Sequence, residues 1–227
     1  MSLTIQPLDA ADDWSIDQCP DVLADIYNDD TSMAIWQRQL HQGVTSYLSE
    51  LMSQQKNISL KLSGTPEQLM AEIHRVFPSA LIIDDACLSA ADFYEDIHQL
   101  LKMFACLFDA KALGLRIDTL ERAMCPRFHV DNINARLITT YHGLATEWLP
   151  HQLSDRSALG SSRASAINTP GAIIADEQFI QRMNCGDVAL LKGEYWQGNE
   201  GRGVIHRSPA LTEQQPRRLV ITCDLIA

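Results

Sequence analysis

The sequence predicts an α+β fold in which a mainly helical N-terminal half packs on a C-terminal β-barrel. Apolar residues recur at three- and four-residue spacing through the first third of the chain, as in amphipathic helices. After Lys111 the chain consists of short β-branched or alternating runs separated by Gly, Pro and Asn, a pattern typical of antiparallel strands. The 227 residues can bury a substantial core, so we expect residues 1–112 and 113–227 to form one compact unit.

The N-terminal half is expected to contain helices and one short strand. Candidate caps support three of the helices: Thr31 or Ser32 for the second, Thr65 followed by Pro66 for the third, and Ser89 for the fourth. A short strand is expected before the third helix, at residues 58–64. The helices themselves are expected at residues 21–29, 31–54, 65–77 and 88–110.

The C-terminal half is expected to form a sandwich or barrel of antiparallel strands. A polar stretch rich in small residues, 149–171, interrupts these strands and is expected to be a long surface loop that could lie over a site. The strands are expected at residues 113–121, 127–132, 135–143, 172–177, 187–193, 203–207 and 217–225.

Composition excludes several classes of function. The chain carries 18 Lys and Arg against 29 Asp and Glu, and this formal net charge of −11 disfavours a nucleic-acid partner. No apolar run approaches the roughly 20 residues that a membrane helix needs, and the acidic N-terminus lacks signal-peptide features. We therefore expect a cytoplasmic protein with no membrane partner. Six cysteines without C-x-x-C spacing argue against a zinc ribbon or a disulfide framework.

The most informative pattern is His129-x-Asp131 followed far downstream by His206. Residues i and i+2 of a strand point to the same face, so one strand can offer an imidazole and a carboxylate to one ion. A distant strand across the barrel would then supply His206. Two histidines and one carboxylate form the set that holds non-haem Fe(II) and leaves positions open for oxygen and a cosubstrate. Taken alone, His129 is equally well interpreted as a packed strand histidine.

The order of motifs resembles that of the Fe(II)/2-oxoglutarate dioxygenases over roughly residues 115–225. H-x-D is followed by Gly-Asp and an apolar strand, then the distal His, then Arg on the last strand. The closest local likeness is to the prolyl-hydroxylase-like branch. The resemblance implies a double-stranded β-helix (jelly roll) in which His129, Asp131 and His206 hold the metal. The segments CPRFHVDN, TTYHG, TEWLP, GDVALLKG and HRSP also resemble an uncharacterised bacterial domain-of-unknown-function family, which implies no activity.

The resemblance also implies that an arginine anchors the far carboxylate of 2-oxoglutarate. Arg217 and Arg218 are the candidates, because arginine offers a planar fork that matches a carboxylate. Strand alternation points only one of them inward, and Arg218 is favoured because it shares a face with Thr222. The family often has a hydroxyl residue two positions after this arginine. Val220 stands there in this chain, which departs from the family pattern.

Five further residues near the motif are candidates for supporting roles. Asn132 could hydrogen-bond a ligand, and Tyr141 and His142 could reach the barrel mouth in a structural or ligand-supporting role. Trp148 could line the pocket mouth, with simple packing as the alternative. Cys125 could add a thiolate and convert the centre into a zinc site.

Three functions compete at this stage. The first is an Fe(II)-dependent oxygenase, using 2-oxoglutarate, that hydroxylates a small molecule or a protein side chain. The second is a cupin-like protein that binds or handles zinc or another divalent ion without redox chemistry. The third is an interaction scaffold that has lost its chemistry. The sequence identifies neither the substrate nor the oligomeric state, and His and Asp accept both iron and zinc.

Overall fold

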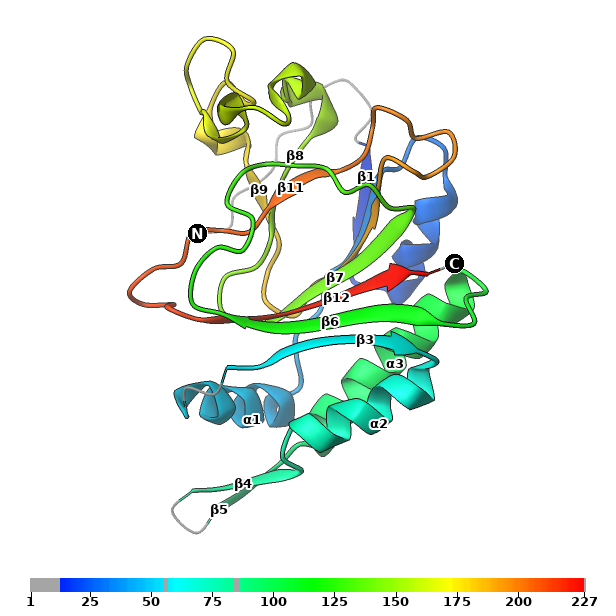
Figure 1. Ribbon diagram of the computed structural model, residues 1–227, viewed down its shortest axis with the longest axis vertical. Helices are drawn as coiled ribbons and strands as arrows, with labels where there is room; N and C mark the ends of the chain where they lie inside the picture. The colour runs from blue at the N-terminus through cyan, green and yellow to red at the C-terminus, as the bar shows by residue number, and fades with distance from the viewer. Residues whose placement is uncertain (1–12, 55–56, 84–85, 227) are drawn as a thin grey trace.

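The centre of the molecule is a seven-stranded sheet (Figure 1). A computed structural model describes residues 13–54, 57–83 and 86–226. Within these residues the sheet is antiparallel except for the parallel pair β1–β2. From one edge to the other its strands are β1 (Trp14–Asp17), β2 (Met33–Trp36), β10 (Val188–Lys192), β7 (Ala135–His142), β12 (Arg218–Leu225), β6 (Leu113–Leu120) and β3 (Ser59–Gly64).

A smaller sheet packs against one face of the large sheet. It consists of β11 (Ile205–Arg207), β8 (Glu147–Leu149) and β9 (Gln181–Arg182), and lies above β7 and β12 in Figure 1. Apolar side chains from both sheets form one buried cluster between them, which includes Met33, Ile138, Trp148, Ala189, Leu191 and Val220. Their burial holds the two sheets together.

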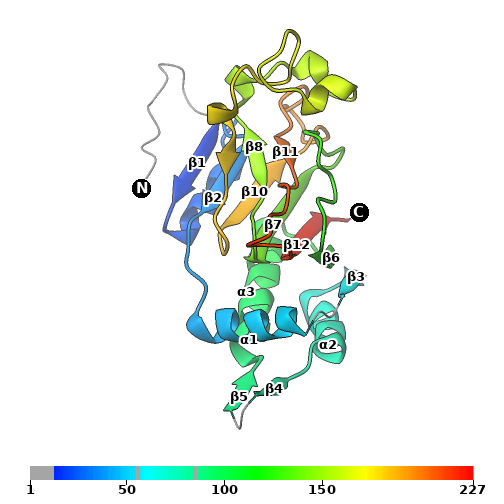
Figure 2. The same ribbon diagram turned by 90° about the vertical axis from the view of Figure 1, so that its left-hand side faces the viewer.

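Helices cover the opposite face of the large sheet, as Figure 2 shows for α1 to α3. They are α1 (Gln42–Ser53), α2 (Pro66–Val76), α3 (Ala91–Leu107) and the 3₁₀-helix η1 (Pro20–Tyr27). A short hairpin, β4 (Ala80–Ile83) and β5 (Ala86–Ser89), extends beyond them. Strand alternation divides the sheet's side chains between two cores. Val188 and Leu190 of β10 pack with the helices, whereas Ala189 and Leu191 face the small sheet.

Several sequence predictions for the first half are confirmed. The segment 58–64 forms β3, and α2 begins at Pro66 after Thr65. Thr65 and Gln68 form a capping box, in which each side chain accepts a hydrogen bond from the other residue's backbone N–H. The longest helix, α3, begins at Ala91, two residues beyond the expected cap Ser89, whose hydroxyl still accepts the Ala91 N–H at 3.1 Å.

The prediction of one helix over residues 31–54 is wrong. Met33–Trp36 is strand β2, paired with β1 and β10, and only Gln42–Ser53 is helical. The apolar spacing of this stretch fitted a helix, but a short apolar run fits a buried strand equally well. The segment 21–29 is helical as expected, in the form of the 3₁₀-helix η1 (Pro20–Tyr27).

The expected division into a helical half and a barrel half is therefore not confirmed. Before residue 113 the chain supplies β1, β2 and β3 to the large sheet as well as the helices. The fold is mixed α/β, with one large sheet shared between both halves of the sequence.

Most of the expected C-terminal strands are present as β6, β7, β10, β11 and β12. Two are not regular strands: in segment 127–132 only His129 forms a β-bridge, with His206, and in segment 172–177 only Ile174 forms bridges, with Ser154 and Ile167. The expected loop 149–171 is irregular, with 3₁₀ turns η2 (His151–Leu153), η3 (Arg156–Ala158) and η4 (Ser162–Ser165). A further turn, η5 (Glu177–Phe179), follows. None of the helices in the described ranges is long and apolar enough to span a bilayer.

Candidate metal centre

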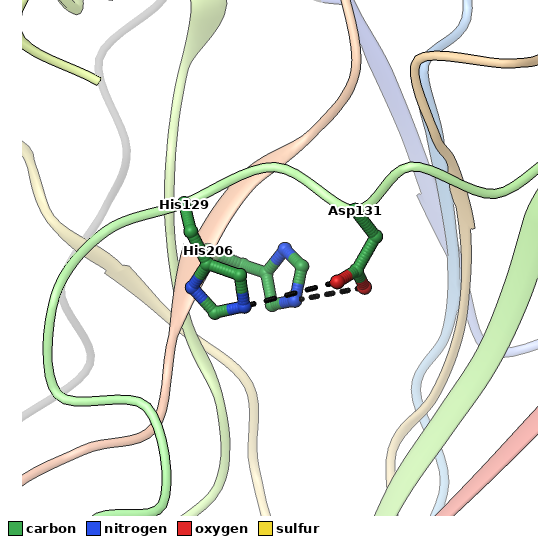
Figure 3. A group of neighbouring side chains, drawn as sticks. All are labelled: His129, Asp131 and His206. Atoms are coloured by element: carbon green, nitrogen blue, oxygen red, sulfur yellow. Dashed lines mark ion pairs between the residues drawn. The ribbon is translucent and has the colours of Figure 1, made fainter. Parts of the chain in front are cut away.

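His129, Asp131 and His206 converge at one place (Figure 3). One ligand atom from each residue lies within 4.8 Å of the others. The Nε2 atoms of His129 and His206 lie 3.8 and 3.4 Å from the two carboxylate oxygens of Asp131. Among the described residues, these three side chains form the one group of His, Cys, Asp or Glu that is close enough together to hold a metal ion. Cys125 is exposed and does not belong to it.

Backbone pairing brings the two histidines together. The N–H of His129 donates to the carbonyl of His206 at 3.0 Å, and the reverse bond measures 2.9 Å. Their rings lie side by side, with centroids 4.5 Å apart. The expectation that His206 lies across the barrel is wrong, since β11 runs directly beside the segment that carries His129. Asp131 follows in a loop and not in a regular strand.

Both imidazoles present the same nitrogen to the centre. Nδ1 of His129 lies 3.0 Å from the carbonyl oxygen of Arg127, and Nδ1 of His206 lies 3.1 Å from that of Val204. Because a carbonyl only accepts, each Nδ1 is the nitrogen that donates to the backbone, and each Nε2 is the nitrogen turned toward Asp131. Backbone carbonyls commonly orient metal-binding histidines in this way.

The pKa shifts of Asp131 and His129 suit a cation. Burial disfavours the charged form of Asp131, but the hydrogen bond and charge of His206, with Arg136 and His129, outweigh it and lower the pKa of the carboxyl. Burial, and then the neighbouring His206, lowers the pKa of His129. A carboxylate beside a neutral imidazole is the state that metal coordination requires.

Arg136 connects Asp131 to the large sheet, a role that the sequence patterns did not identify. Its Nη1 donates to Oδ2 of Asp131 at 2.5 Å. Its Nε and Nη2 donate to the two oxygens of Asp224 on β12, at 2.6 and 2.8 Å. Arg136 and Asp224 are direct cross-strand partners on β7 and β12. The carboxylate of Asp131 is thereby held from the sheet side.

The backbone of the Asp131 loop is fixed by the turn after β10. The Glu194 N–H donates to the Asp131 carbonyl at 3.0 Å, and the Tyr195 N–H to the Ile133 carbonyl at 3.1 Å. Gly193 makes this approach possible, since a Cβ there would lie 2.2 Å from the Ile133 carbonyl oxygen and 2.7 Å from that of Asp131. Only glycine fits at this position without displacing the loop.

A cavity that opens to solvent lies beside the two histidines, and Arg218 lines it. Arg218 is 2% exposed. It donates to hydroxyl groups of three residues, to Ser208 at 2.8 Å, Thr140 at 3.1 Å and Thr146 at 3.3 Å. Its Nε is buried without a hydrogen-bond partner among the described residues. Burial lowers the pKa of Arg218 to about 10, and no carboxylate contributes to that shift.

Arg217 points elsewhere. Its guanidinium donates to the carbonyl of Met52 at 2.9 Å and to the side chain of Asn57 at 2.7 Å, and lies 3.3 Å from Glu121. Strand alternation accounts for the difference, because Val220 and Thr222 line the cavity together with Arg218. Of the two candidates, the structure brings only Arg218 to the cavity that contains the histidines.

Of the five supporting candidates, only Cys125 lines this cavity among the described residues, and the other four lie outside it. Asn132 is exposed, and in the described part of the chain its side chain makes no hydrogen bond. Tyr141 faces the helices, where its hydroxyl donates to Asp96. His142 is half-buried, and burial and the charge of Arg217 lower its pKa. Trp148 packs edge-to-face on Trp14 in the core between the sheets.

The long loop 149–171 packs behind the metal centre. Its buried residues Ala158 and Ala164 form a cluster with Phe128 and Ile205, the neighbours of the two histidines. The Phe128 N–H also donates to the Ala164 carbonyl at 3.1 Å. Among the described residues that line the cavity, none belongs to this loop. The loop supports the histidine-bearing segments from behind.

Comparisons with known proteins identify the family. The family model described as Protein of unknown function (DUF1826) matches residues 17–224, and no curated protein matches the chain. Among solved structures, the rice dioxygenase for auxin oxidation is 10% identical, with a TM-score of 0.48, over 86% of this chain and 74% of that one. A Pseudomonas putida prolyl-4-hydroxylase is 10% identical, with a TM-score of 0.40, over 90% and 96%. HygX from Streptomyces hygroscopicus, with nickel, 2-oxoglutarate and hygromycin B bound, is 10% identical, with a TM-score of 0.40, over 90% and 86%.

Proposed function

The chain belongs to the DUF1826 family, whose description names no activity, and we propose from its cavity that it is an Fe(II)- and 2-oxoglutarate-dependent oxygenase. The main support for this proposal is that two features occur together at one cavity. Two histidines of the three-ligand metal set and a buried arginine without a carboxylate partner line the same cavity. In this proposal the two packed sheets form a double-stranded β-helix.

The three ligands fit Fe(II). Two neutral imidazoles and one carboxylate leave half of an octahedral shell free, as in non-haem iron oxygenases. His129 and His206 would bind through Nε2, since each Nδ1 is engaged by a backbone carbonyl. Bound iron would supply the reactivity with oxygen that protein side chains lack. Because His129 is one-third exposed, oxygen and a substrate can approach from its side.

Arg218 would bind the far carboxylate of 2-oxoglutarate. A buried cation without an anion is costly, and a carboxylate ligand offsets that cost with charge-assisted hydrogen bonds. The free Nε of Arg218 provides one donor for such a ligand. Val220 stands two positions after this arginine, where the family often has a hydroxyl residue. In this chain the hydroxyl groups near the guanidinium come from Ser208, Thr140 and Thr146. They can share in binding the carboxylate.

The overall reaction would convert 2-oxoglutarate, oxygen and a substrate C–H bond into succinate, carbon dioxide and a hydroxylated product. The substrate would be a small molecule or a protein side chain. It would enter where Met124, Cys125 and Arg207 line the cavity. Arg207 is held there by an ion pair with Glu147 at 2.6 Å.

The alternative, a zinc-binding protein without redox chemistry, uses the same three ligands but gives Arg218 no role. A metal store has no need of a buried cation within the same cavity. Metal analysis separates the two functions. A protein that retains stoichiometric zinc through dialysis, and whose Fe(II) form does not consume 2-oxoglutarate, would be a zinc protein.

Succinate formation tests the proposed reaction. Metal-free protein is reloaded with Fe(II) and incubated with 2-oxoglutarate and oxygen, and succinate is measured. We expect succinate from the wild type and from a control, Arg217→Met, because Arg217 points away from the cavity. We expect His206→Ala and Arg218→Met to lose it. Equal succinate formation in His206→Ala would refute the proposal.

A further inference from the structure

The strongest contact to the proposed metal ligands comes from Arg136. This guanidinium uses all three of its nitrogens: Nη1 donates to Asp131, and Nε and Nη2 donate to Asp224. The side chains of Arg136 and Asp224 are only 15% and 16% exposed. Two carboxylates therefore share one arginine in a largely desolvated position, where charge-assisted hydrogen bonds are strong.

The two oxygens of Asp131 have different surroundings. Oδ2 accepts Nη1 of Arg136 at 2.5 Å and lies 3.4 Å from Nε2 of His206. Oδ1 lies 3.8 Å from Nε2 of His129 and accepts no hydrogen bond from a described residue. Arg136 thus hydrogen-bonds one oxygen of Asp131 and leaves the other oxygen available to bind a metal ion.

Arg136 is itself fixed by the sheet. Both carboxylate oxygens of its cross-strand partner Asp224 accept hydrogen bonds from the guanidinium, and these bonds fix the direction of Nη1. Asp131 lies in a loop, so its side chain lacks the restraint that a regular strand would provide. The sheet therefore restrains the carboxylate through Arg136.

We propose that Arg136, held by Asp224, is a positioning residue that makes Asp131 a one-oxygen metal ligand through Oδ1. This inference rests on the proposed function, because it assumes that a divalent cation occupies the site. The arrangement keeps Asp131 from chelating the ion with both oxygens. It thereby preserves the open coordination position that a cosubstrate needs.

Electrostatic repulsion alone predicts the opposite effect of Arg136 on metal affinity. Arg136 places a positive charge next to a cation site, so removing it reduces repulsion and would tighten metal binding. If Arg136 acts by positioning, its removal frees the carboxylate and weakens binding. Loss of a residue that orients a metal ligand typically costs about 10–100-fold in affinity. The sign of the effect therefore separates the two explanations.

The experiment measures cobalt(II) affinity and the visible spectrum of the bound cobalt in wild type, Arg136→Gln, Arg136→Lys and Asp224→Asn. The matched control is Arg38→Gln on the helical face. Arg38 makes a two-pronged ion pair with Asp96, at 2.5 and 2.9 Å, and their side chains are similarly buried, 11% and 19% exposed. Thermal unfolding of each metal-free variant reports the loss of stability separately.

We expect Arg136→Gln to raise the cobalt(II) dissociation constant about 10–100-fold and to change the cobalt spectrum. Arg136→Lys and Asp224→Asn should shift both in the same direction by less, and Arg38→Gln should lower only the unfolding temperature. Unchanged or tighter cobalt binding in Arg136→Gln would overturn the positioning role while leaving the proposed function intact. A wild type that binds no cobalt would overturn both.

Discussion

Replacing Arg218 by methionine is expected to weaken 2-oxoglutarate binding by at least about 30-fold without unfolding the protein. Burial lowers the pKa of Arg218 to about 10. The usual value is about 12.5, and each pKa unit corresponds to about 1.4 kcal/mol, so the buried charge costs roughly 3 kcal/mol at neutral pH. Three hydrogen bonds to hydroxyl groups offset this cost by about 1 kcal/mol each. The two contributions nearly cancel.

The free energy of unfolding should therefore change by no more than about 2 kcal/mol in Arg218→Met. This change is smaller than the roughly 3–5 kcal/mol that is typically lost when one partner of a buried ion pair is removed. Ligand binding should respond much more strongly. Loss of the buried partner of a carboxylate costs about 2–5 kcal/mol, which weakens affinity by roughly 30-fold or more.

Thermal unfolding with and without 2-oxoglutarate measures both quantities. With Mn(II) bound and the ligand at 100 times its dissociation constant, the wild type should gain about 2.7 kcal/mol. For a chain of this size that corresponds to a rise in Tm of roughly 5–10 °C. With an affinity at least about 30-fold weaker, Arg218→Met should gain at most about 0.9 kcal/mol at the same concentration, so its rise in Tm should be no more than about a third of the wild-type rise. An undiminished rise, or a ligand-free variant that is already unfolded, would refute this account of Arg218.

The other predictions concern the metal, pH and the ligand loop. His206→Ala should abolish stoichiometric cobalt(II) binding in a titration, while circular dichroism stays unchanged. Because the pKa of His142 is lower in the folded protein than in the unfolded chain, the unfolded chain binds a proton more readily. The free energy of unfolding should therefore fall as the pH drops below about 6.5. Urea unfolding at pH 5 to 8 should show a weaker fall in His142→Gln, and identical slopes would contradict this. Gly193→Ala should cost about 1–3 kcal/mol and weaken metal binding, because the added Cβ meets the Asp131 carbonyl at 2.7 Å.

Strand periodicity predicted much of what the site depends on. The alternation in residues 135–143 and 217–225 located β7 and β12, and it indicated that Arg218 shares a face with Thr222. The i, i+2 spacing brought His129 and Asp131 into one group, although their segment has only a bridge in place of a full strand. Local geometry was sufficient for these inferences.

Features that depend on strand pairing could not be predicted. Arg136 follows Asp131 by five residues, but its partner Asp224 lies 88 residues further along the chain. Only the β7–β12 register brings them together. Thr146 and Ser208 reach Arg218 from irregular segments, so no periodic pattern indicates them. Single-sequence periodicity carries no information about such pairings.

The short apolar strand β2 shows a second limit. Met33–Trp36 is buried between β1 and β10, and its residues continue the helical spacing of the following helix. Burial on both faces removes the alternation that identifies a half-exposed strand. The same ambiguity led to the expected separation of helical and barrel halves.

The most direct test of the account is anaerobic absorption spectroscopy of the Fe(II)-loaded protein during titration with 2-oxoglutarate. A 2-oxo acid that chelates Fe(II) gives a weak visible charge-transfer band. We expect a saturable band in the wild type, no band in His206→Ala, and in Arg218→Met a band that needs at least about 30 times as much 2-oxoglutarate to develop. A wild type that binds Fe(II) but develops no band at any 2-oxoglutarate concentration would contradict the cosubstrate claim. A wild type that binds no Fe(II) would contradict the metal centre itself.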